Sequence, residues 1–380
     1  MSSPSQPGRQ PRIAIIGAGV SGLTCAKELV RAGRCQVHLL DAAPHVGGRV
    51  ATTRRADGFL LDHGFQILIR SYPEVKRQLD LPGLGLESFG QGAVLAAGGG
   101  ARHVIANPLT CPRYVFKTLW LVVFHWGLLG TLVDILMLLW RVILPGWVRY
   151  LGSRDPYRGL RERWSLDVGA DENIRAAKAG APRTFPPDTG AFLRDHVRLS
   201  SDFLTEFLEP FFEAIYVSPL SSQHPSMFEF VLSCLAVPGS ASLPKGGMQA
   251  VPEQLLEQVR VAAKSSSAGA DSAFALRLGA RVSGLEFPGG DGGPTLVLEG
   301  GEREAYDAVI VAAEWPAALR LLASVPGAPG GERGSGPGAG GDTSVLNATS
   351  SVTWYFALPE ASLPVREPLI VLNAARRDDA

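Results

Sequence analysis

Three glycines near the start of the chain are spaced so that the backbone could approach a phosphate group. The segment Gly17-Ala18-Gly19-Val20-Ser21-Gly22 fits the pattern G-x-G-x-x-G. In this pattern the first glycine permits a tight turn, the second lets the backbone reach a pyrophosphate, and the third allows close helix–strand packing. The free N–H groups of the helix that follows, beginning at Val20 and Ser21, would point at the anion. The chemistry that this spacing indicates is the binding of a dinucleotide.

The motif needs a strand before it and a helix after it, and the sequence predicts both. A β-branched run at 13–16 predicts a buried strand, and the apolar spacing over 20–31 predicts a helix that stops at Gly33. A second strand is expected at 37–40, and Asp41 follows it, where a carboxylate can accept hydrogen bonds from ribose hydroxyls. The alternative is a glycine-rich turn with a surface aspartate. Strand, glycines, helix and acid agree, which favours the dinucleotide site.

Composition excludes several classes of protein. The chain has 380 residues, of which 46% are apolar and 19% charged, so it can bury a core and is expected to form two or three domains. It carries 36 Lys and Arg against 36 Asp and Glu, a net charge of zero, which argues against a nucleic-acid partner. No spacing typical of a metal site is present, so no metal is expected.

The cysteines and the N-terminus bear on the compartment. Cys25, Cys35, Cys111 and Cys234 are far apart in the sequence and form no C-x-x-C pair. This pattern favours free thiols and an intracellular, reducing compartment over a disulfide framework. Residues 1–10 are polar and show no secretory signal. The organelle and the oligomeric state stay open.

A second glycine pair distinguishes between dinucleotides. Asp41 leads within a few residues to Gly47-Gly48-Arg49, which offers another close backbone approach and a cation for the pyrophosphate. A domain that binds only a nicotinamide cofactor does not need this feature, so FAD is favoured over NAD(P). A nicotinamide-linked reductase is the alternative.

On these residues the chain resembles the FAD-dependent amine oxidase/phytoene desaturase superfamily, which includes protoporphyrinogen oxidase-like proteins. Members of this family carry Gly-Gly-Arg shortly after the ribose-binding acid. Three further segments resemble family patterns: Asp62-His63-Gly64, Pro244-Lys245-Gly246-Gly247-Met248, and the strand from Asp307 to Ala313. The resemblance extends over residues 13–372.

The resemblance implies FAD as the cofactor and gives individual residues a role. Gly17, Gly19 and Gly22 would hold the pyrophosphate and Asp41 the ribose. Arg49 would neutralise phosphate charge, and the backbone of Val282 would lie against adenine. The resemblance places these further residues at the cofactor: Val20, Ser21, Gly47, Gly48, Asp62, His63, Gly64, Gly247, Met248 and Ala312.

The predicted fold is α/β, with a Rossmann-like FAD/NAD(P)-binding domain, a doubly wound parallel sheet, and an interleaved α+β substrate domain. The cofactor domain is expected at 11–72 and 243–322, and the substrate domain at 73–242 and 343–380. A flexible Gly/Pro-rich loop is expected over 323–342. Further strands are expected at 273–278, 281–287, 295–299, 308–312 and 352–357.

The resemblance also implies a reaction, in which the flavin takes a hydride from a C–N or C–C bond of an apolar small molecule and an acceptor reoxidises it. Among protein groups, His63 is a weak catalytic candidate, and a structural histidine fits its turn as well. Phe211, Phe212 and Tyr216 fit either a substrate cavity or the core. The family's Gly-Asp segment that closes the flavin site is not found after Leu372. The alternative function is therefore a non-catalytic or truncated, membrane-associated nucleotide-binding homologue.

The segment 114–147 is strongly apolar and allows three interpretations. Residues 118–139 are long enough to span a bilayer, with His125 and Asp134 as polar interruptions. The polar residues recur near helical spacing, which also suits a helix lying in a membrane surface, or one packed in the substrate domain. The arginine-rich flank from Arg141 onward suits anionic headgroups. Peripheral membrane contact, buried core and a spanning helix all remain open.

Overall fold

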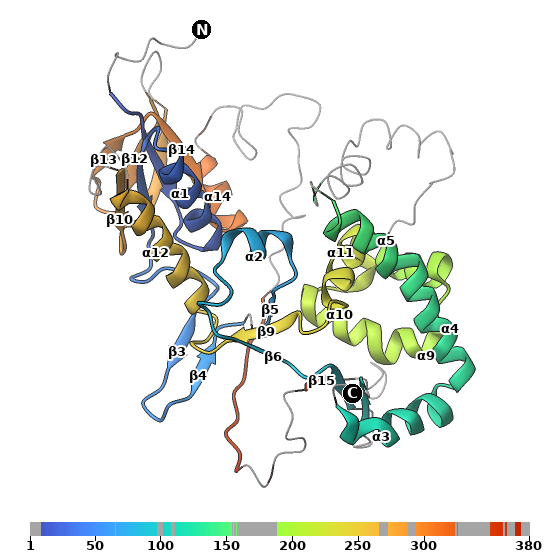
Figure 1. Cartoon of the computed structure of the whole chain (residues 1–380). Coiled ribbons are helices and arrows are strands. Elements are labelled where there is room, and N and C mark those ends of the chain that lie inside the picture. Colours follow the sequence, from blue (N-terminus) through green and yellow to red (C-terminus); the bar gives the residue numbers. More distant parts are fainter. Residues whose placement is uncertain are drawn as a thin grey trace, which may run out of the picture. The chain divides into compact units, whose positions relative to one another are not determined.

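The computed structural model describes residues 9–64, 66–96, 102–107, 111–153, 155, 157, 188–265, 273–287, 293–323, 325, 350–359, 362 and 369–373. The chain divides into two compact units, each assembled from separate stretches (Figure 1). The first comprises Met1–Gln66, Gln78–Leu86 and Pro244–Ala348, and the second Ile67–Arg77, Glu87–Leu243 and Thr349–Ala380. Residues 67–72, which we expected in the cofactor domain, fall in the second unit because β5 (Leu68–Ile69) pairs with β9 (Ala241–Pro244) there.

The first unit is built on a four-stranded parallel sheet, which confirms the α/β prediction. Its strand order is β10-β2-β1-β14, with consistent register from β1 to both neighbours. Ala14 and Ile15 of β1 are fully buried, as expected for a central strand covered on both faces. The strands are β1 (Arg12–Ile16), β2 (Gln36–Leu40), β10 (Phe274–Arg277) and β14 (Ala308–Val311).

The chain passes from β1 to β2 and β10 on one side and later returns to place β14 on the other side of β1, which creates a topological switch point. In open parallel sheets, ligands bind in the crevice at the carboxyl ends of the strands at such a point. Gly17 follows β1 and Ala312 follows β14, so both lie at this edge.

Two helices of this unit, α1 (Val20–Ala32) and α12 (Ala250–Lys264), pack against each other. The helix α1 ends where the sequence predicts, since Gly33 has φ +66° and its N–H bonds to the Val30 carbonyl. Its buried face includes a charged residue: Lys27 is fully buried and donates to the Gln78 carbonyl (2.9 Å) and to Gln258 Oε1 (3.2 Å).

The other described residues of the first unit include two antiparallel sheets and the helix α14. The helix α14 lies on β11, around a core that includes Leu285, Leu296 and Tyr306. These elements are β3 (Thr52–Arg54) paired with β4 (Leu60–Asp62), the sheet β11 (Val282–Glu286), β12 (Thr295–Leu298) and β13 (Arg303–Ala305), and α14 (Trp315–Leu322).

Among its described residues, the second unit has two small sheets and a core of aliphatic and aromatic residues carried mainly on helices. Its sheets have the orders β5-β9-β6 and β15-β7-β8, with β6 (Leu86–Ser88), β7 (Gly92–Ala96), β8 (Arg102–Ala106) and β15 (Ile370–Asn373). Its helices from the chain's centre onward are α8 (Thr189–Ala191), η6 (Phe192–Val197), α9 (Ser201–Phe203), η7 (Leu204–Leu208), α10 (Glu209–Tyr216), η8 (Leu220–Ser222) and α11 (Pro225–Leu235), besides α2 (Pro73–Gln78), which begins in this unit.

The apolar segment around residue 120 forms two helical stretches and not one. Gly127 has φ +80° and interrupts the helix that we expected to run through 118–139. The first stretch comprises η2 (Pro112–Tyr114), α3 (Val115–Trp120) and η3 (Leu121–His125). The second comprises α4 (Leu128–Leu138), η4 (Leu139–Ile143), α5 (Leu144–Gly146) and η5 (Trp147–Leu151).

The strand expected at 352–357 does not form. The described residues 350–359 contain no strand, because the chain there pairs with no neighbour in the described structure. The Gly/Pro-rich loop at 323–342 lies almost wholly outside the described residues.

All four cysteines are free, and burial raises the pKa of the Cys234 thiol to about 11, so this thiol is protonated at neutral pH.

We predict that Phe212→Ala destabilises the second unit by about 3–5 kcal/mol, because the ring is fully buried among other aromatic residues and its loss leaves a cavity. Phe116→Ala is the matched control, since that ring is 81% exposed. Urea unfolding followed by tryptophan fluorescence measures both, as six of the seven tryptophans belong to the second unit. Equal losses for the two variants would contradict the core assignment.

Candidate cofactor site

The turn between β1 and α1 admits only glycine at two positions. Gly17 has φ +109°, and a Cβ there would lie 2.8 Å from the Ala312 carbonyl oxygen. A Cβ on Gly22 would lie 1.8 Å from the carbonyl oxygen of Gly17. These contacts explain the first and third glycines of the motif as requirements of the protein's own packing.

Gly19 is different, because nothing in the described protein requires a glycine there. Its φ is −73°, which any residue adopts, and a Cβ would meet nothing nearer than the Gly47 carbonyl oxygen at 3.9 Å. Gly19 is also the N-cap of α1, and no side chain caps this helix end. The N–H groups of the first turn, from Val20 and Ser21 onward, are therefore presented beside open space, as anion binding requires.

The second glycine pair lies against the first. The Gly47 N–H donates to the Ala18 carbonyl (2.9 Å), and Gly19 and Gly47 form an isolated parallel bridge. Gly47 and Gly48 have φ +114° and +58°, and a Cβ on Gly48 would lie 3.7 Å from the Cα of Gly19. Two glycine turns thus form one cradle of bare backbone.

Asp41 joins these elements at the end of β2. One oxygen of its carboxylate accepts the N–H of Ala18 (2.6 Å), and the other accepts the N–H of Ala43 (2.7 Å). A carboxylate can accept about four hydrogen bonds, so this one retains capacity for ribose hydroxyls. Asp41, Gly17 and Ala312 all lie at the carboxyl edge of the parallel sheet, as a dinucleotide site requires.

Arg49 lies beyond the second glycine pair and is largely exposed. Its Nε lies 3.5 Å from Glu314 Oε1, and both side chains are more than half exposed. An exposed pair of this kind contributes little to stability, so the guanidinium can move to an anionic ligand at small cost.

Asp62 fixes the turn that contains Gly247 and Met248. Its Oδ1 accepts the N–H of Met248 (2.8 Å) and the hydroxyl of Thr52 (2.5 Å). Gly247 has φ +79°, and a Cβ there would lie 2.6 Å from the Thr52 side chain. The structure therefore brings together two segments that the sequence only suggests separately.

The remaining site candidates vary in position. His63 is exposed, and its Nε2 lies 2.7 Å from Thr53 Oγ1; Gly64 follows it with φ +94° and open space around it. Val282 opens β11 beside a β-bulge opposite Leu298, with its side chain partly buried. No contact of His63 identifies it as a catalytic group, and its role stays a prediction.

Sequence reasoning missed Gln249 and Thr52. The Gln249 side chain donates to the Val46 carbonyl (2.9 Å), and its backbone N–H donates to Thr52 Oγ1 (2.9 Å). Gln249 thereby holds the loop of the second glycine pair against the start of α12. The one feature of the sequence that could have indicated Gln249 is its position directly after Gly246-Gly247-Met248.

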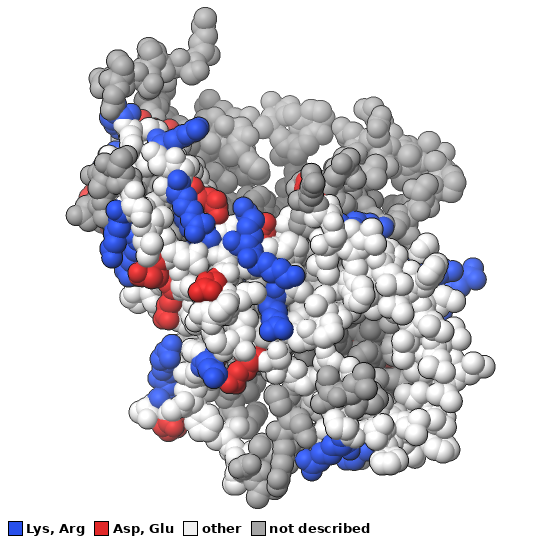
Figure 2. All heavy atoms as spheres, in the orientation of Figure 1, with Lys and Arg blue, Asp and Glu red and all other residues white. Residues whose placement is uncertain are grey.

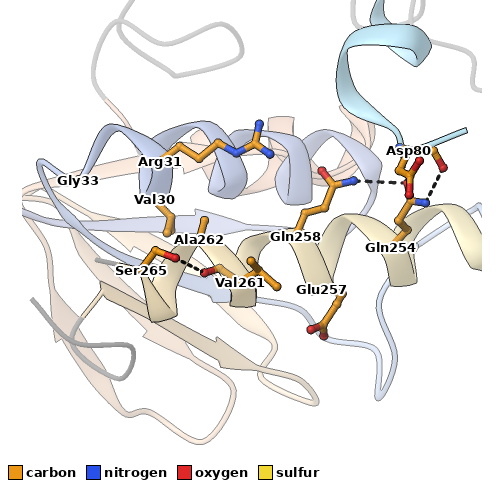
Figure 3. A pocket seen from close by; sticks show the side chains of 10 residues that line it. All are labelled: Val30, Arg31, Gly33, Asp80, Gln254, Glu257, Gln258, Val261, Ala262 and Ser265. Carbon is orange, nitrogen blue, oxygen red and sulfur yellow. Dashed lines mark hydrogen bonds between the residues drawn. The ribbon is translucent and has the colours of Figure 1, made fainter. Parts of the chain in front are cut away.

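The described residues also form a surface pocket of about 660 Å³ at the other end of α1 (Figure 3). Arg31 and Gly33 line one side, and α12 lines the other, with Gln254 donating to the Asp80 carbonyl (2.8 Å). Since α1 runs away from the glycine turn, this pocket lies at the opposite end of the helix and is not the cofactor cradle.

Comparison with known proteins agrees with this geometry. The sequence model of the flavin containing amine oxidoreductase family matches residues 20–329. The chain belongs to this family. A solved oxidoreductase from Methanosarcina mazei matches 83% of this chain and 61% of its own, at 15% identity and a TM-score of 0.51, and shows the same fold.

Two curated relatives of this amine oxidoreductase family member match over short stretches. A probable zeta-carotene desaturase from Synechococcus elongatus is 43% identical over 61 residues, 16% of this chain and 12% of its own length. An L-amino acid oxidase from Cerastes cerastes is 38% identical over 81 residues, 21% of this chain and 16% of its own length. The chain therefore matches only a small part of the length of either relative.

We predict that Asp62→Ala destabilises the first unit by about 2–4 kcal/mol, because the buried Met248 N–H loses its charged acceptor. Asp57→Ala is the control, since that carboxylate is exposed and its ion pair is with exposed Arg55. Thermal unfolding followed by circular dichroism measures both variants. An Asp62 variant as stable as the control would show that the carboxylate does not hold the turn.

Proposed function

We propose that this protein is an FAD-dependent oxidoreductase that removes a hydride from a C–N or C–C bond of an apolar small molecule. The observation that carries the proposal is the cradle formed by the two glycine turns. Within it, Gly19 is the one glycine that the protein's own packing and backbone conformation do not require. Membership of the flavin containing amine oxidoreductase family supports the flavin.

FAD is favoured because the cradle has two layers. The turn of Gly17, Gly19 and Gly22 offers one set of backbone N–H groups, and Gly47-Gly48 offers a second close approach. Asp41 would bind the ribose hydroxyls, and Arg49 would exchange Glu314 for phosphate.

The turn of Gly247 and Met248, together with Asp62, would hold another part of the same cofactor. Asp62 and Thr52 fix Gly247 and Met248, so these backbone groups are preorganised. His63, Gly64 and Ala312 would border the same cofactor, and Val282 would contact the adenine.

The reaction balances as a two-electron oxidation. The substrate loses a hydride from carbon and a proton from the neighbouring nitrogen or carbon, so a C=N or C=C bond forms. Bound flavin supplies the hydride acceptor, and an external two-electron acceptor completes the cycle. The residues of the chain bind and orient the cofactor.

An apolar substrate is favoured by the character of the second unit. Its core consists of aliphatic and aromatic side chains, and burial raises the pKa of Tyr72 and of Tyr216 well above the usual value. The buried Tyr216 hydroxyl has no hydrogen-bond partner among the described residues, which indicates how apolar these surroundings are. One of the two relatives is named for a carotene and the other for amino acids, and these surroundings favour the carotene-like class.

We predict that Gly19→Val abolishes FAD binding and lowers the free energy of unfolding of the apoprotein by only about 1 kcal/mol, the effect of replacing a glycine N-cap. The added Cβ enters the cradle and comes no nearer to the protein than 3.9 Å, at the Gly47 carbonyl oxygen. Titration of FAD into apoprotein, followed by quenching of flavin fluorescence, measures binding, and thermal unfolding measures stability.

Gly22→Val is the matched control, and it should lose both FAD binding and stability, because its Cβ collides with the Gly17 carbonyl. Wild-type FAD affinity in the Gly19 variant would show that the cofactor is held elsewhere. We expect both variants to lose FAD binding and the Gly22 variant to lose far more stability than the Gly19 variant.

A further inference from the structure

The helices from α3 to η5 expose an unusually apolar face. Half of the large apolar side chains exposed in the described part of the chain lie between Phe116 and Val148. Leu129, Leu136 and Trp140 are 77, 60 and 74% exposed. Figure 2 shows the surface over α4 and α5 almost free of charged residues. Patches of this kind mark sites of interaction with protein or membrane.

The stretch from α4 to η5 buries polar as well as apolar side chains and exposes mainly apolar ones. Its buried stripe contains Thr131 and Asp134, and Asp134 accepts the backbone N–H (2.9 Å) and the hydroxyl (2.5 Å) of Ser200. Leucine, isoleucine, valine and tryptophan side chains cover the outward face. A helix at a water boundary points its polar residues outward, whereas the outward face of this helix is apolar.

The charges of this region point to an anionic surface. Between residues 111 and 153, Asp134 is the only acid, and it is buried. The formal positive charges of the same stretch are Arg113, Lys117, Arg141 and Arg149, of which the first two are exposed at the start of α3. Figure 2 shows basic residues on the surface beside α3. Exposed Trp120 and Trp140 are of the type enriched where a bilayer meets water.

The same helix is held in a manner that a spanning helix would not allow. Leu128–Leu151 is the one helix in the described residues long and apolar enough to cross a membrane, yet its stripe packs into the unit's own core. Near its end, a Cβ on Gly146 would lie 1.8 Å from the Ser233 hydroxyl, and Arg149 pairs with buried Glu229 (2.7 Å). These contacts hold the helix along the protein's surface.

Nor is it an ordinary core helix. Only 22% of the most apolar 18-residue segment of Leu128–Leu151 is buried inside the protein. A helix with one polar, protein-bound stripe and an apolar remainder fits a bilayer surface, in which its outward face enters the acyl chains.

We propose that the face from Phe116 to Val148 docks in the plane of a membrane that contains anionic lipids. The outward apolar side chains enter the bilayer, and Arg113 and Lys117 bind lipid phosphates at its edge. This proposal goes beyond the proposed redox function and does not depend on it, because vesicle binding is measured on the protein and not on the flavin.

The test is co-flotation of the full 380-residue chain with vesicles. We expect binding to vesicles of phosphatidylcholine with phosphatidylglycerol, and binding at least several-fold weaker to phosphatidylcholine alone. Failure to bind either kind of vesicle would overturn the proposal. Equal binding to both kinds would overturn its anionic part.

The variant Leu129→Ser/Leu136→Ser/Trp140→Ser should weaken binding by on the order of a hundredfold, since three side chains no longer enter the bilayer. These side chains are exposed, so circular dichroism and thermal unfolding should not change. The matched control is Phe59→Ser/Val261→Ser/Trp315→Ser, which removes exposed apolar side chains from the first unit and should leave binding intact. Equal effects of the two variants would contradict the assigned face.

Arg113→Gln/Lys117→Gln tests the charge contribution. We expect binding to anionic vesicles to weaken by on the order of tenfold and binding to neutral vesicles to stay unchanged. Equal weakening toward both kinds of vesicle would contradict the role of these charges.

Two further measurements exclude other occupants of the face. Bound protein should be released by alkaline carbonate, and resistance to carbonate would indicate a spanning helix instead. Sedimentation without vesicles tests whether the face binds a second copy of the chain. That alternative would be supported if the wild type is a dimer that binds no vesicles and the variant Leu129→Ser/Leu136→Ser/Trp140→Ser is a monomer.

Discussion

The approach of Gly22 to the carbonyl of Gly17 is the contact on which the cofactor unit depends. It lets α1 start directly at the end of β1, so the helix N-terminus, the end of β14 and Asp41 share one edge of the sheet. Once these backbones are so close, the loop of Gly47 can bond to Ala18 and add a second layer. The cradle follows from sterics at a few positions where only hydrogen fits.

The first unit could be predicted well from sequence because its signals are local. A β-branched run, three spaced glycines, an apolar helix face and Gly33 specify β1, α1 and the turn within some twenty residues. The link from Asp62 to Met248 and the bond from Gln249 to Val46 join residues 186 and 203 positions apart. Periodicity carries no information on such pairs, so the turn was expected and its anchors were not.

The second unit was harder to predict, for a physical reason. A leucine-rich helix has the same pattern whether its apolar face meets protein or lipid, so the segment 114–147 left three interpretations open. Only the structure shows that Thr131 and Asp134 face inward and that Leu129, Leu132 and Leu136 face outward. It also shows the break at Gly127, a glycine with positive φ that a composition count treats as part of one long helix. The strand expected at 352–357 does not form, because an alternating apolar pattern does not by itself supply a neighbouring strand to pair with.

The visible absorption spectrum of the purified chain, before and after heat releases any cofactor, tests the central claim most directly. The cradle of Gly17, Gly19, Gly47 and Gly48 predicts flavin bands near one equivalent per chain, and release of FAD on heating. A colourless protein that also takes up no added FAD would contradict the account, because the geometry at the carboxyl edge of the sheet would then hold no flavin.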